Sequence, residues 1–225
     1  MNWTEILEFS RGPFFKVALF IFVAGMLYRL VRILLLGWTR DRVPGKGSKL
    51  WGSIRSFLKG IIILPFIPWV KNAFTRNPIT YLAGGIFHLG LFAVIFLGTP
   101  HMLVWKSLLR FDWPTLPVPV IDFLAAAAIV AMITLLINRH IHPVMKRISA
   151  LSDYLNWFLV FLPMLSGYMM THHLFFRYEV LFSLHMISVN VLLIWIPLSR
   201  ISHFMFYFFS RAIHGAQFGK RAVTP

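Results

Sequence analysis

Long runs of hydrophobic residues, separated by short polar segments, dominate the pattern along the chain. A membrane-spanning helix needs roughly 20 predominantly apolar residues to cross about 30 Å of hydrocarbon. Runs that reach or approach this length cover residues 14–36, 81–105, 120–138, 155–171 and 180–209. The pattern therefore predicts an all-α, polytopic membrane protein in which five transmembrane helices form one bundle, a single domain over residues 1–225.

The composition supports this class. Of the 225 residues, 58% are hydrophobic and 13% are charged, which excludes an ordinary soluble domain. Glu5 and Glu8 precede the first run where a cleavable signal would carry basic residues, so we expect that run to remain as an anchor. The chain has no cysteine, which excludes disulfides, thiolate-bound iron–sulfur clusters and covalently attached c-type haem. Any redox centre must use histidine.

The net charge of +15 is distributed in a way that indicates topology rather than nucleic-acid binding. Basic residues follow the first, third and fifth runs, in "RDRVPGKGSK" (40–49), in "RHIHPVMKR" (139–147), and at Arg211, Lys220 and Arg221. The opposite ends hold most of the acids: Glu5, Glu8, Asp112, Asp122 and Glu179. Because basic segments stay in the cytoplasm, the amino terminus is expected outside and the carboxyl terminus inside.

The segment 50–76, between the first two runs, mixes basic residues with tryptophan and phenylalanine and contains two prolines. This favours an amphipathic segment at the inner membrane surface over another span. Such a segment has two interpretations: it contacts lipid headgroups, or it is a docking surface for a cytoplasmic partner subunit.

Histidines within the apolar runs are the candidates for chemistry, because glycine loops that bind phosphate, nucleophile elbows and suitably spaced carboxylate pairs are all missing. His185 and His203 are 18 residues apart, which on one helix is five turns or about 27 Å. Both would lie on one face, one near each membrane surface. A polar ring in hydrocarbon is costly unless it is paired, and imidazole is a common axial ligand of haem iron.

The run 81–105 supplies His88 and His101. Since this helix and the last one run in opposite directions, His88 is expected level with His203, and His101 level with His185. Two haems would then lie one above the other across the membrane.

One geometric difficulty concerns the 13 residues between His88 and His101, which on an ideal helix would put these side chains on different faces. Gly98 and Pro100 lie between them, and a proline bends or rotates a helix. His172 and His173 are the alternative outer ligands; as interfacial residues they would instead lie near haem propionates or quinone.

The motifs "IFHLG" (86–90) and "LHMISVNVLLIWIPLSRISH" (184–203) resemble the haem-binding segments of the respiratory nitrate reductase gamma subunit family, which are five-helix dihaem b-type cytochromes. "PLSRISH" places Arg200 three residues before His203, as in that family. Nitrate reductase subunits carry a second histidine ten residues after the first, where this chain has Gly98. With His101 three residues later, the sequence is more similar to the branch found with heterodisulfide-reductase-like and high-molecular-weight cytochrome c complexes.

The resemblance implies a function. His88 and His203 would ligate an inner haem b and His185 an outer haem b, for which the helix levels predict His101 as the second ligand. Arg200 would contact haem propionates. The chain would carry electrons across a bacterial or archaeal cytoplasmic membrane, between menaquinone and a cytoplasmic iron–sulfur subunit. Further partners would be membrane subunits and periplasmic cytochrome c or iron–sulfur subunits of a respiratory complex; the chain alone would not turn over a soluble substrate.

A quinone site needs apolar walls and a few polar or titratable groups. At the outer end the candidates are Lys106, Asp112, His172, His173, Arg177 and Glu179. Two other classes of function remain open: a haem-free transporter whose histidines relay protons or bind metal, and a structural anchor subunit without haem. Only the cytochrome would be coloured.

Overall fold

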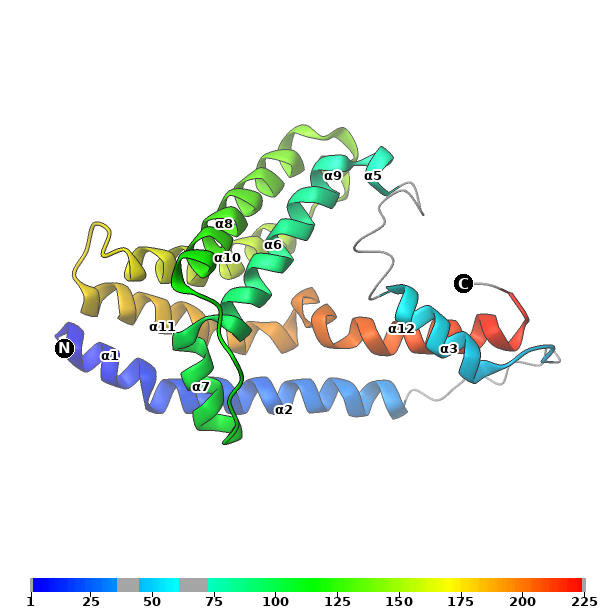
Figure 1. Cartoon of the computed structure of the whole chain (residues 1–225), viewed down its shortest axis with the longest axis horizontal. Helices are drawn as coiled ribbons and strands as arrows, with labels where there is room; N and C mark the ends of the chain where they lie inside the picture. Colours follow the sequence, from blue (N-terminus) through cyan, green and yellow to red (C-terminus); the bar gives the residue numbers. More distant parts are fainter. Residues whose placement is uncertain (1, 36–44, 61–72, 224–225) are drawn as a thin grey trace. The chain divides into compact units, whose positions relative to one another are not determined.

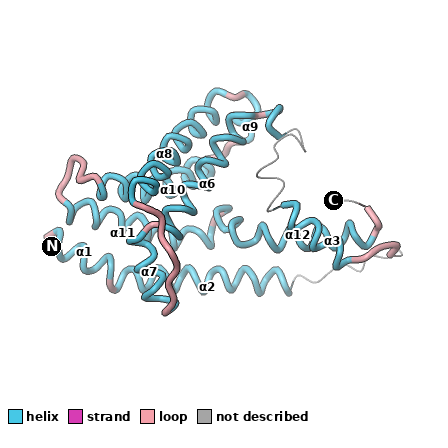
Figure 2. Tube along the Cα trace, viewed as in Figure 1, coloured by secondary structure: helices cyan, strands magenta, loops and turns pink. Residues whose placement is uncertain are grey.

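The computed structural model describes residues 2–35, 45–60 and 73–223, and this part of the chain is all-α (Figure 2). Its helices are joined by turns and short loops. Four stretches are long and apolar enough to cross a membrane: Trp3–Leu35, Pro78–Leu97, Val118–Ile141 and Tyr178–Leu198. The protein is therefore a multi-pass membrane protein.

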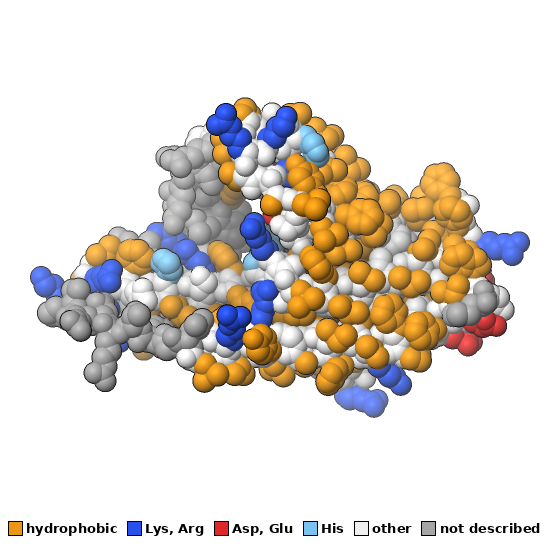
Figure 3. Space-filling model, turned by 180° about the vertical axis from the view of Figure 1, so that it is seen from behind, with side chains coloured by type: hydrophobic (Ala, Val, Ile, Leu, Met, Phe, Trp, Pro, Cys, Tyr) orange, Lys and Arg blue, Asp and Glu red, His pale blue; other side chains and the backbone are white. Residues whose placement is uncertain are grey.

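The predicted fourth run, 155–171, forms helix α10 (Leu151–Thr171), which is not among those four stretches. Polar residues, Asp153, Asn156 and Ser166, interrupt its apolar character, and Pro163 lies inside the helix. A five-span bundle thus stays a prediction. The space-filling view in Figure 3 shows hydrophobic side chains spread over much of one face, as expected for a surface in contact with lipid.

The chain divides into two compact units. Unit 1 comprises Met1–Val17 and Phe74–Leu192, and unit 2 comprises Ala18–Ala73 and Leu193–Pro225. Helix α1 (Trp3–Arg11) belongs to unit 1, and most of α2 (Pro13–Leu35) belongs to unit 2.

In unit 1, α6 (Pro78–Leu97) lies along α8 (Val118–Ile141) (Figure 1). Gly90 permits the close approach, because a Cβ there would lie 2.5 Å from the Leu124 carbonyl and 2.7 Å from the Ala128 Cβ. Asn138, only 3% exposed, donates its amide to the Thr80 hydroxyl at 2.9 Å. Without this hydrogen bond, burial of the Asn138 amide would cost considerable free energy.

Two further contacts join helices of unit 1. The indole of Trp157 on α10 donates to the Met132 carbonyl of α8 at 2.8 Å. Helix α11 (Tyr178–Trp195) contacts α1, because the Asn190 amide donates to the Ser10 carbonyl at 2.8 Å. The last carbonyls of a helix lack partners within it, so a fully buried asparagine stabilises the end of α1.

The helix predicted over 81–105 is interrupted. It ends at Leu97, Gly98 is extended (φ −79°, ψ 129°), and α7 (Thr99–Leu109) follows. Pro100 falls in the first turn of α7, where the missing N–H costs nothing. The expected departure from an ideal helix between His88 and His101 is thus confirmed.

The helix predicted over 180–209 is also interrupted, and here the prediction of a continuous helix was wrong. After α11 come the 3₁₀ turn η3 (Ile196–Leu198), an extended Ser199 (φ −121°, ψ 178°), the 3₁₀ turn η4 (Arg200–Ser202) and α12 (His203–Lys220). Pro197 has no N–H to continue the helical hydrogen bonding. His185 and His203 therefore lie on separate helices and are not five full turns apart on one helix.

In unit 2, α3 (Lys49–Leu58) lies along α12 (Figure 1). Gly52 packs directly against Gly215 and Gly219, leaving no room for a Cβ between the helices. The Ser53 hydroxyl donates to the Ala212 carbonyl at 2.8 Å.

The predicted interfacial segment 50–76 is described only in part. Residues 61–72 lie outside the described residues, and α5 (Ala73–Arg76) is a single turn. Helix α3 is amphipathic: Gly52 and Ser56 are buried against α12, whereas Leu50 and Trp51 are exposed. This is the pattern of a helix that lies in the membrane interface, a location that stays a prediction.

Candidate functional site

The imidazole rings of His101 on α7 and His185 on α11 face one another within unit 1. Their ring centres are 6.2 Å apart and their planes are inclined by 62°. Two imidazoles that bind one metal ion from opposite sides have ring centres about 6 Å apart, because each metal–nitrogen bond is about 2 Å long. The spacing of His101 and His185 therefore fits a shared iron atom.

Helix α10 holds the His185 ring. Its Nδ1–H donates to the Pro163 carbonyl at 3.0 Å and lies 3.3 Å from the Ser166 hydroxyl. A Cβ at Gly167 would lie 3.0 Å from the ring's Cε1, so this glycine makes room for the imidazole. Histidines that bind metals commonly donate their other N–H to a carbonyl, which fixes the tautomer and orients the ring. In His185 this leaves Nε2 as the nitrogen that could bind a metal ion.

The break between α6 and α7 positions His101. Gly98 is the last residue before α7, and the half-buried His101 follows in the first turn. The Gly98 N–H donates to the Val94 carbonyl, in the last turn of α6, at 3.3 Å, and a Cβ on residue 98 would lie 3.6 Å from the His101 Nδ1. A side chain at Gly98 would place its Cβ 2.6 Å from that carbonyl. Because residue 98 is a glycine, the chain can turn there without a clash, and this turn sets the position of His101.

His88 lies on α6 beside an open surface. Its Nδ1–H donates to the Gly84 carbonyl at 2.7 Å, and its ring lies 4.9 Å from that of Phe87. A Cβ at Gly84 or Gly85 would meet no atom within 4 Å. A surface without side chains next to a histidine is what a large flat ligand such as haem requires.

His203 is the first residue of α12, and its Nδ1–H donates to the Arg200 carbonyl at 3.0 Å. Three of the four predicted ligands, His88, His185 and His203, thus share the same hydrogen-bonding pattern. Arg200 is exposed. Since His88 belongs to unit 1 and His203 to unit 2, the inner pairing stays a prediction.

The outer quinone candidates fall into separate groups. Lys106 and Asp112 form an exposed ion pair at 2.7 Å, and the Lys106 ammonium holds the pKa of Asp112 below its ordinary value. His173 has a positive φ of 52°, uncommon for a residue with a side chain. Arg177 and Glu179 are exposed at the start of α11.

Among these candidates, His172 lies beside both an aromatic ring and a carboxylate. Its Nδ1–H donates to the Tyr168 carbonyl at 3.0 Å, and its ring stacks on that of Tyr168 with centres 4.2 Å apart. Its Nε2 lies 3.8 Å from the Asp122 carboxylate. An aromatic ring, an imidazole and a carboxylate in this order can bind a quinol ring and accept its proton.

Sequence reasoning missed Asp122, Pro163 and Gly167. Asp122 was noted only as an acid at an outer helix end, and its sequence neighbours do not indicate that His172, 50 residues away, lies beside it. Pro163 and Gly167 are one turn apart, but only the packing of α10 on α11 shows that both contact His185.

Among residues 2–35, 45–60 and 73–223, no three histidine or acidic side chains gather closely enough to hold a metal ion. A structural zinc site needs four protein ligands, whereas the iron of a b-type haem needs two axial ones. The pair His101 and His185 therefore fits haem better than a bare metal ion.

Comparison with known proteins gives one distant relationship. No family model matches the chain, and no solved structure matches it. The sequence is similar to that of a protein from Nitratidesulfovibrio vulgaris (strain Hildenborough) named only "Protein", with 25% identity over 217 residues. The match covers 93% of this chain and 92% of the relative, so the likeness extends over nearly the whole of both.

Proposed function

We propose that the protein is a b-type cytochrome, the membrane subunit of a respiratory oxidoreductase complex. It carries electrons across the membrane between the menaquinone pool and a cytoplasmic iron–sulfur subunit. The facing rings of His101 and His185 are the observation that carries this proposal. Two buried or half-buried imidazoles at a spacing suited to one iron atom are hard to explain in a passive anchor, because polar rings in a membrane are costly.

Two haem b groups are proposed, an outer one between His101 and His185 and an inner one between His88 and His203. Haem b supplies a one-electron carrier when bound. The protein's contribution is to fix the ligands: Pro163 and Ser166 orient His185, and the Gly84 carbonyl orients His88. Arg200 is proposed to contact the propionates of the inner haem, as a guanidinium suits a carboxylate.

Menaquinol oxidation is proposed at the outer end, beside Tyr168, His172 and Asp122. Since His172 donates through Nδ1, its Nε2 can accept a proton from a quinol hydroxyl. The Asp122 carboxylate at 3.8 Å then stabilises the protonated ring. Protons released here would leave on the outer side. Lys106, Asp112, His173, Arg177 and Glu179 remain candidates for contacts with the quinone head group.

The topology that goes with this function has five spans, in which α10 crosses the membrane in addition to the four long stretches. The amino terminus faces outside, the carboxyl terminus lies in the cytoplasm, and the membrane is a bacterial or archaeal cytoplasmic membrane. The amphipathic helix α3 and the basic helix α12 then lie on the inner side, where the iron–sulfur subunit would bind. Other membrane subunits and periplasmic cytochrome c or iron–sulfur subunits would complete the complex; nucleic acid is not a partner.

The alternative is a protein without haem, either a transporter that uses membrane histidines as a relay or a structural anchor. Transport of protons or cations usually needs carboxylates within the spans. Among the described residues of the four spans, only Glu5, Glu8, Asp122 and Glu179 are acidic, and all lie near helix ends.

An optical titration tests the proposal. The full chain, purified in detergent, is mixed anaerobically with a soluble menaquinol analogue, and the spectrum between 400 and 600 nm, roughly the window of haem bands, is compared with the dithionite-reduced one. We expect a b-type spectrum that the quinol reduces at least in part. A colourless protein would overturn the cytochrome; a haem spectrum that quinol leaves oxidised would overturn the quinone site alone.

A further inference from the structure

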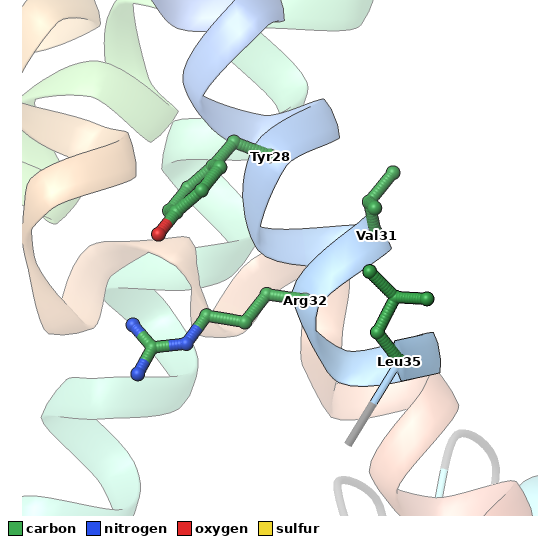
Figure 4. Close-up of a pocket in the computed structure, with 4 residues that line it drawn as sticks. All are labelled: Tyr28, Val31, Arg32 and Leu35. Atoms are coloured by element: carbon green, nitrogen blue, oxygen red, sulfur yellow. The ribbon is translucent and has the colours of Figure 1, made fainter. Parts of the chain in front are cut away.

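Two shallow grooves follow the last two turns of α2, within unit 2. One is shown in Figure 4; its volume is about 240 Å³ and it is lined by Tyr28, Val31, Arg32 and Leu35. The other has a volume of about 300 Å³ and is lined by Arg29, Arg32, Ile33 and Phe206 of α12. Arg32 lines both grooves, so its guanidinium is the polar centre of a largely apolar surface.

Arg29 is fixed by neighbours in the same unit. Its guanidinium donates to the Ser202 hydroxyl at 2.5 Å, and that hydroxyl donates to the Ser199 carbonyl at 2.9 Å. Ser202 is 3% exposed, whereas Arg29 is half-buried and also lines the second groove. A guanidinium has five N–H donors, so the bond to Ser202 leaves others for a ligand in the groove.

Arg32 is exposed and lies three residues after Arg29, a spacing that puts both on one side of the helix. Figure 4 shows the Tyr28 hydroxyl and the Arg32 guanidinium extending to the same side of α2. Val31 and Leu35 are 50% and 78% exposed, so apolar side chains that line the same groove as Arg32 face the surroundings. In a membrane helix such side chains contact acyl chains.

The described part of unit 2 contains no carboxylate side chain that could pair with these arginines. Asp41 is the one acid within the ranges of unit 2, and it lies outside the described residues. The described residues of the unit instead add further cations, among them Lys49, Arg55 and Lys220. The described part of unit 2 therefore supplies no counter-charge for Arg32.

We infer that the grooves bind one anionic phospholipid, with its phosphate between Arg29 and Arg32 and an acyl chain along Val31 and Leu35. A guanidinium binds phosphate through two parallel hydrogen bonds, and the Tyr28 hydroxyl can add another. The apolar walls argue for lipid rather than free phosphate, which would gain nothing from them. The inference needs only a membrane protein and does not depend on haem.

Native mass spectrometry of the full chain tests the inference. The protein is exchanged into detergent containing equal amounts of phosphatidylglycerol and phosphatidylcholine, and bound lipid is counted for the wild type, Arg32→Gln and Arg29→Gln. Arg147→Gln is the matched control, because Arg147 is an exposed cation on α9 (Pro143–Ile148) in unit 1. Size-exclusion profiles and circular dichroism verify folding. Arg32→Lys keeps the positive charge but lacks the two parallel N–H donors of a guanidinium.

We expect the wild type and Arg147→Gln to prefer phosphatidylglycerol, and Arg32→Gln to lose about fivefold in its retention, as expected for one cation near an anionic headgroup. Arg32→Lys should retain an intermediate amount. Equal retention of both lipids, or no effect of either arginine, would overturn the inference. So would displacement by millimolar inorganic phosphate, which would indicate a soluble anion, or a loss of haem with unchanged lipid, which would assign Arg32 to a propionate.

Discussion

Gly167 and His185 are in direct contact: a Cβ on Gly167 would lie 3.0 Å from Cε1 and 3.2 Å from Nδ1 of the imidazole. Helix α10 thus supports the ring from two positions one turn apart, through the Pro163 carbonyl and through the missing side chain of Gly167. The position of this histidine is set by a helix that carries none of the four predicted ligands.

Gly167→Ala should displace the His185 ring. Forcing an extra carbon into such a contact typically costs about 1–3 kcal/mol. We expect a lower midpoint of thermal unfolding and a reduced content or altered potential of the outer haem, measured by redox titration. Gly85→Ala is the control, because a Cβ there meets no atom within 4 Å. Identical titration curves for Gly167→Ala and the wild type would show that the contact does not position the ring.

Asp122→Asn should slow quinol oxidation. The carboxylate is a positioning residue that acts through His172, so we expect a loss of about tenfold, less than the roughly 10²–10⁴-fold that a proton acceptor itself contributes. The amide keeps the shape of the carboxylate but not its charge, so it no longer stabilises the imidazole once that ring has accepted a proton. Glu8→Gln, which changes an exposed acid on α1, is the control. An unchanged rate of quinol oxidation would contradict the role of Asp122.

Asn138→Leu should destabilise unit 1. The change removes the hydrogen bond to Thr80 and leaves that hydroxyl without its donor. Hydrogen bonds between membrane helices are worth about 0.6–2 kcal/mol, so we expect a loss of this size in detergent unfolding experiments. Thr134→Val is a suitable comparison, because the Thr134 hydroxyl bonds only to the Val130 carbonyl of its own helix. Equal stabilities of the two variants would argue against a contribution from the bond between α6 and α8.

The packing of α3 on α12 can be tested by crosslinking, since the chain has no cysteine of its own. Ser53→Cys combined with Ala212→Cys should crosslink under mild oxidation, because the Ser53 hydroxyl contacts the Ala212 carbonyl at 2.8 Å. Adding Gly52→Leu should abolish the crosslink, as there is no space for a side chain between Gly52 and Gly215. Gly45→Leu is the control, because a Cβ there would lie nearest to the Lys220 side chain, 3.2 Å from its Cγ, and not between the backbones of α3 and α12. A crosslink that survives Gly52→Leu would contradict this packing.

The apolar runs predicted the all-α class and four long spans correctly, because hydrophobic length alone decides them. The break before His101 was predictable from Gly98 and Pro100. The break around Pro197 was missed, since a proline is also found within membrane helices. Here α11 ends at Trp195, and an extended Ser199 follows a single 3₁₀ turn that contains Pro197.

The candidate site was predictable only in part. The positions of His101 and His185 in the sequence, together with the antiparallel directions of their helices, predicted that the two side chains lie at the same level. The structure brings their rings together. Their role as haem ligands stays a prediction, as does the pairing of His88 with His203. The supporting contacts of Pro163, Gly167 and Asp122 depend on how helices distant in the sequence pack, which no local pattern specifies.

The most direct test counts haem in purified protein by the pyridine haemochrome method, for the wild type, His101→Ala, His185→Ala and the surface control His140→Ala. We predict two b haems in the wild type and in His140→Ala, and the loss of the same single haem in His101→Ala and His185→Ala, with matching changes in the reduced-minus-oxidised spectrum. A haem content that neither substitution lowers would contradict the shared iron site, and a wild-type protein without haem would contradict the cytochrome itself.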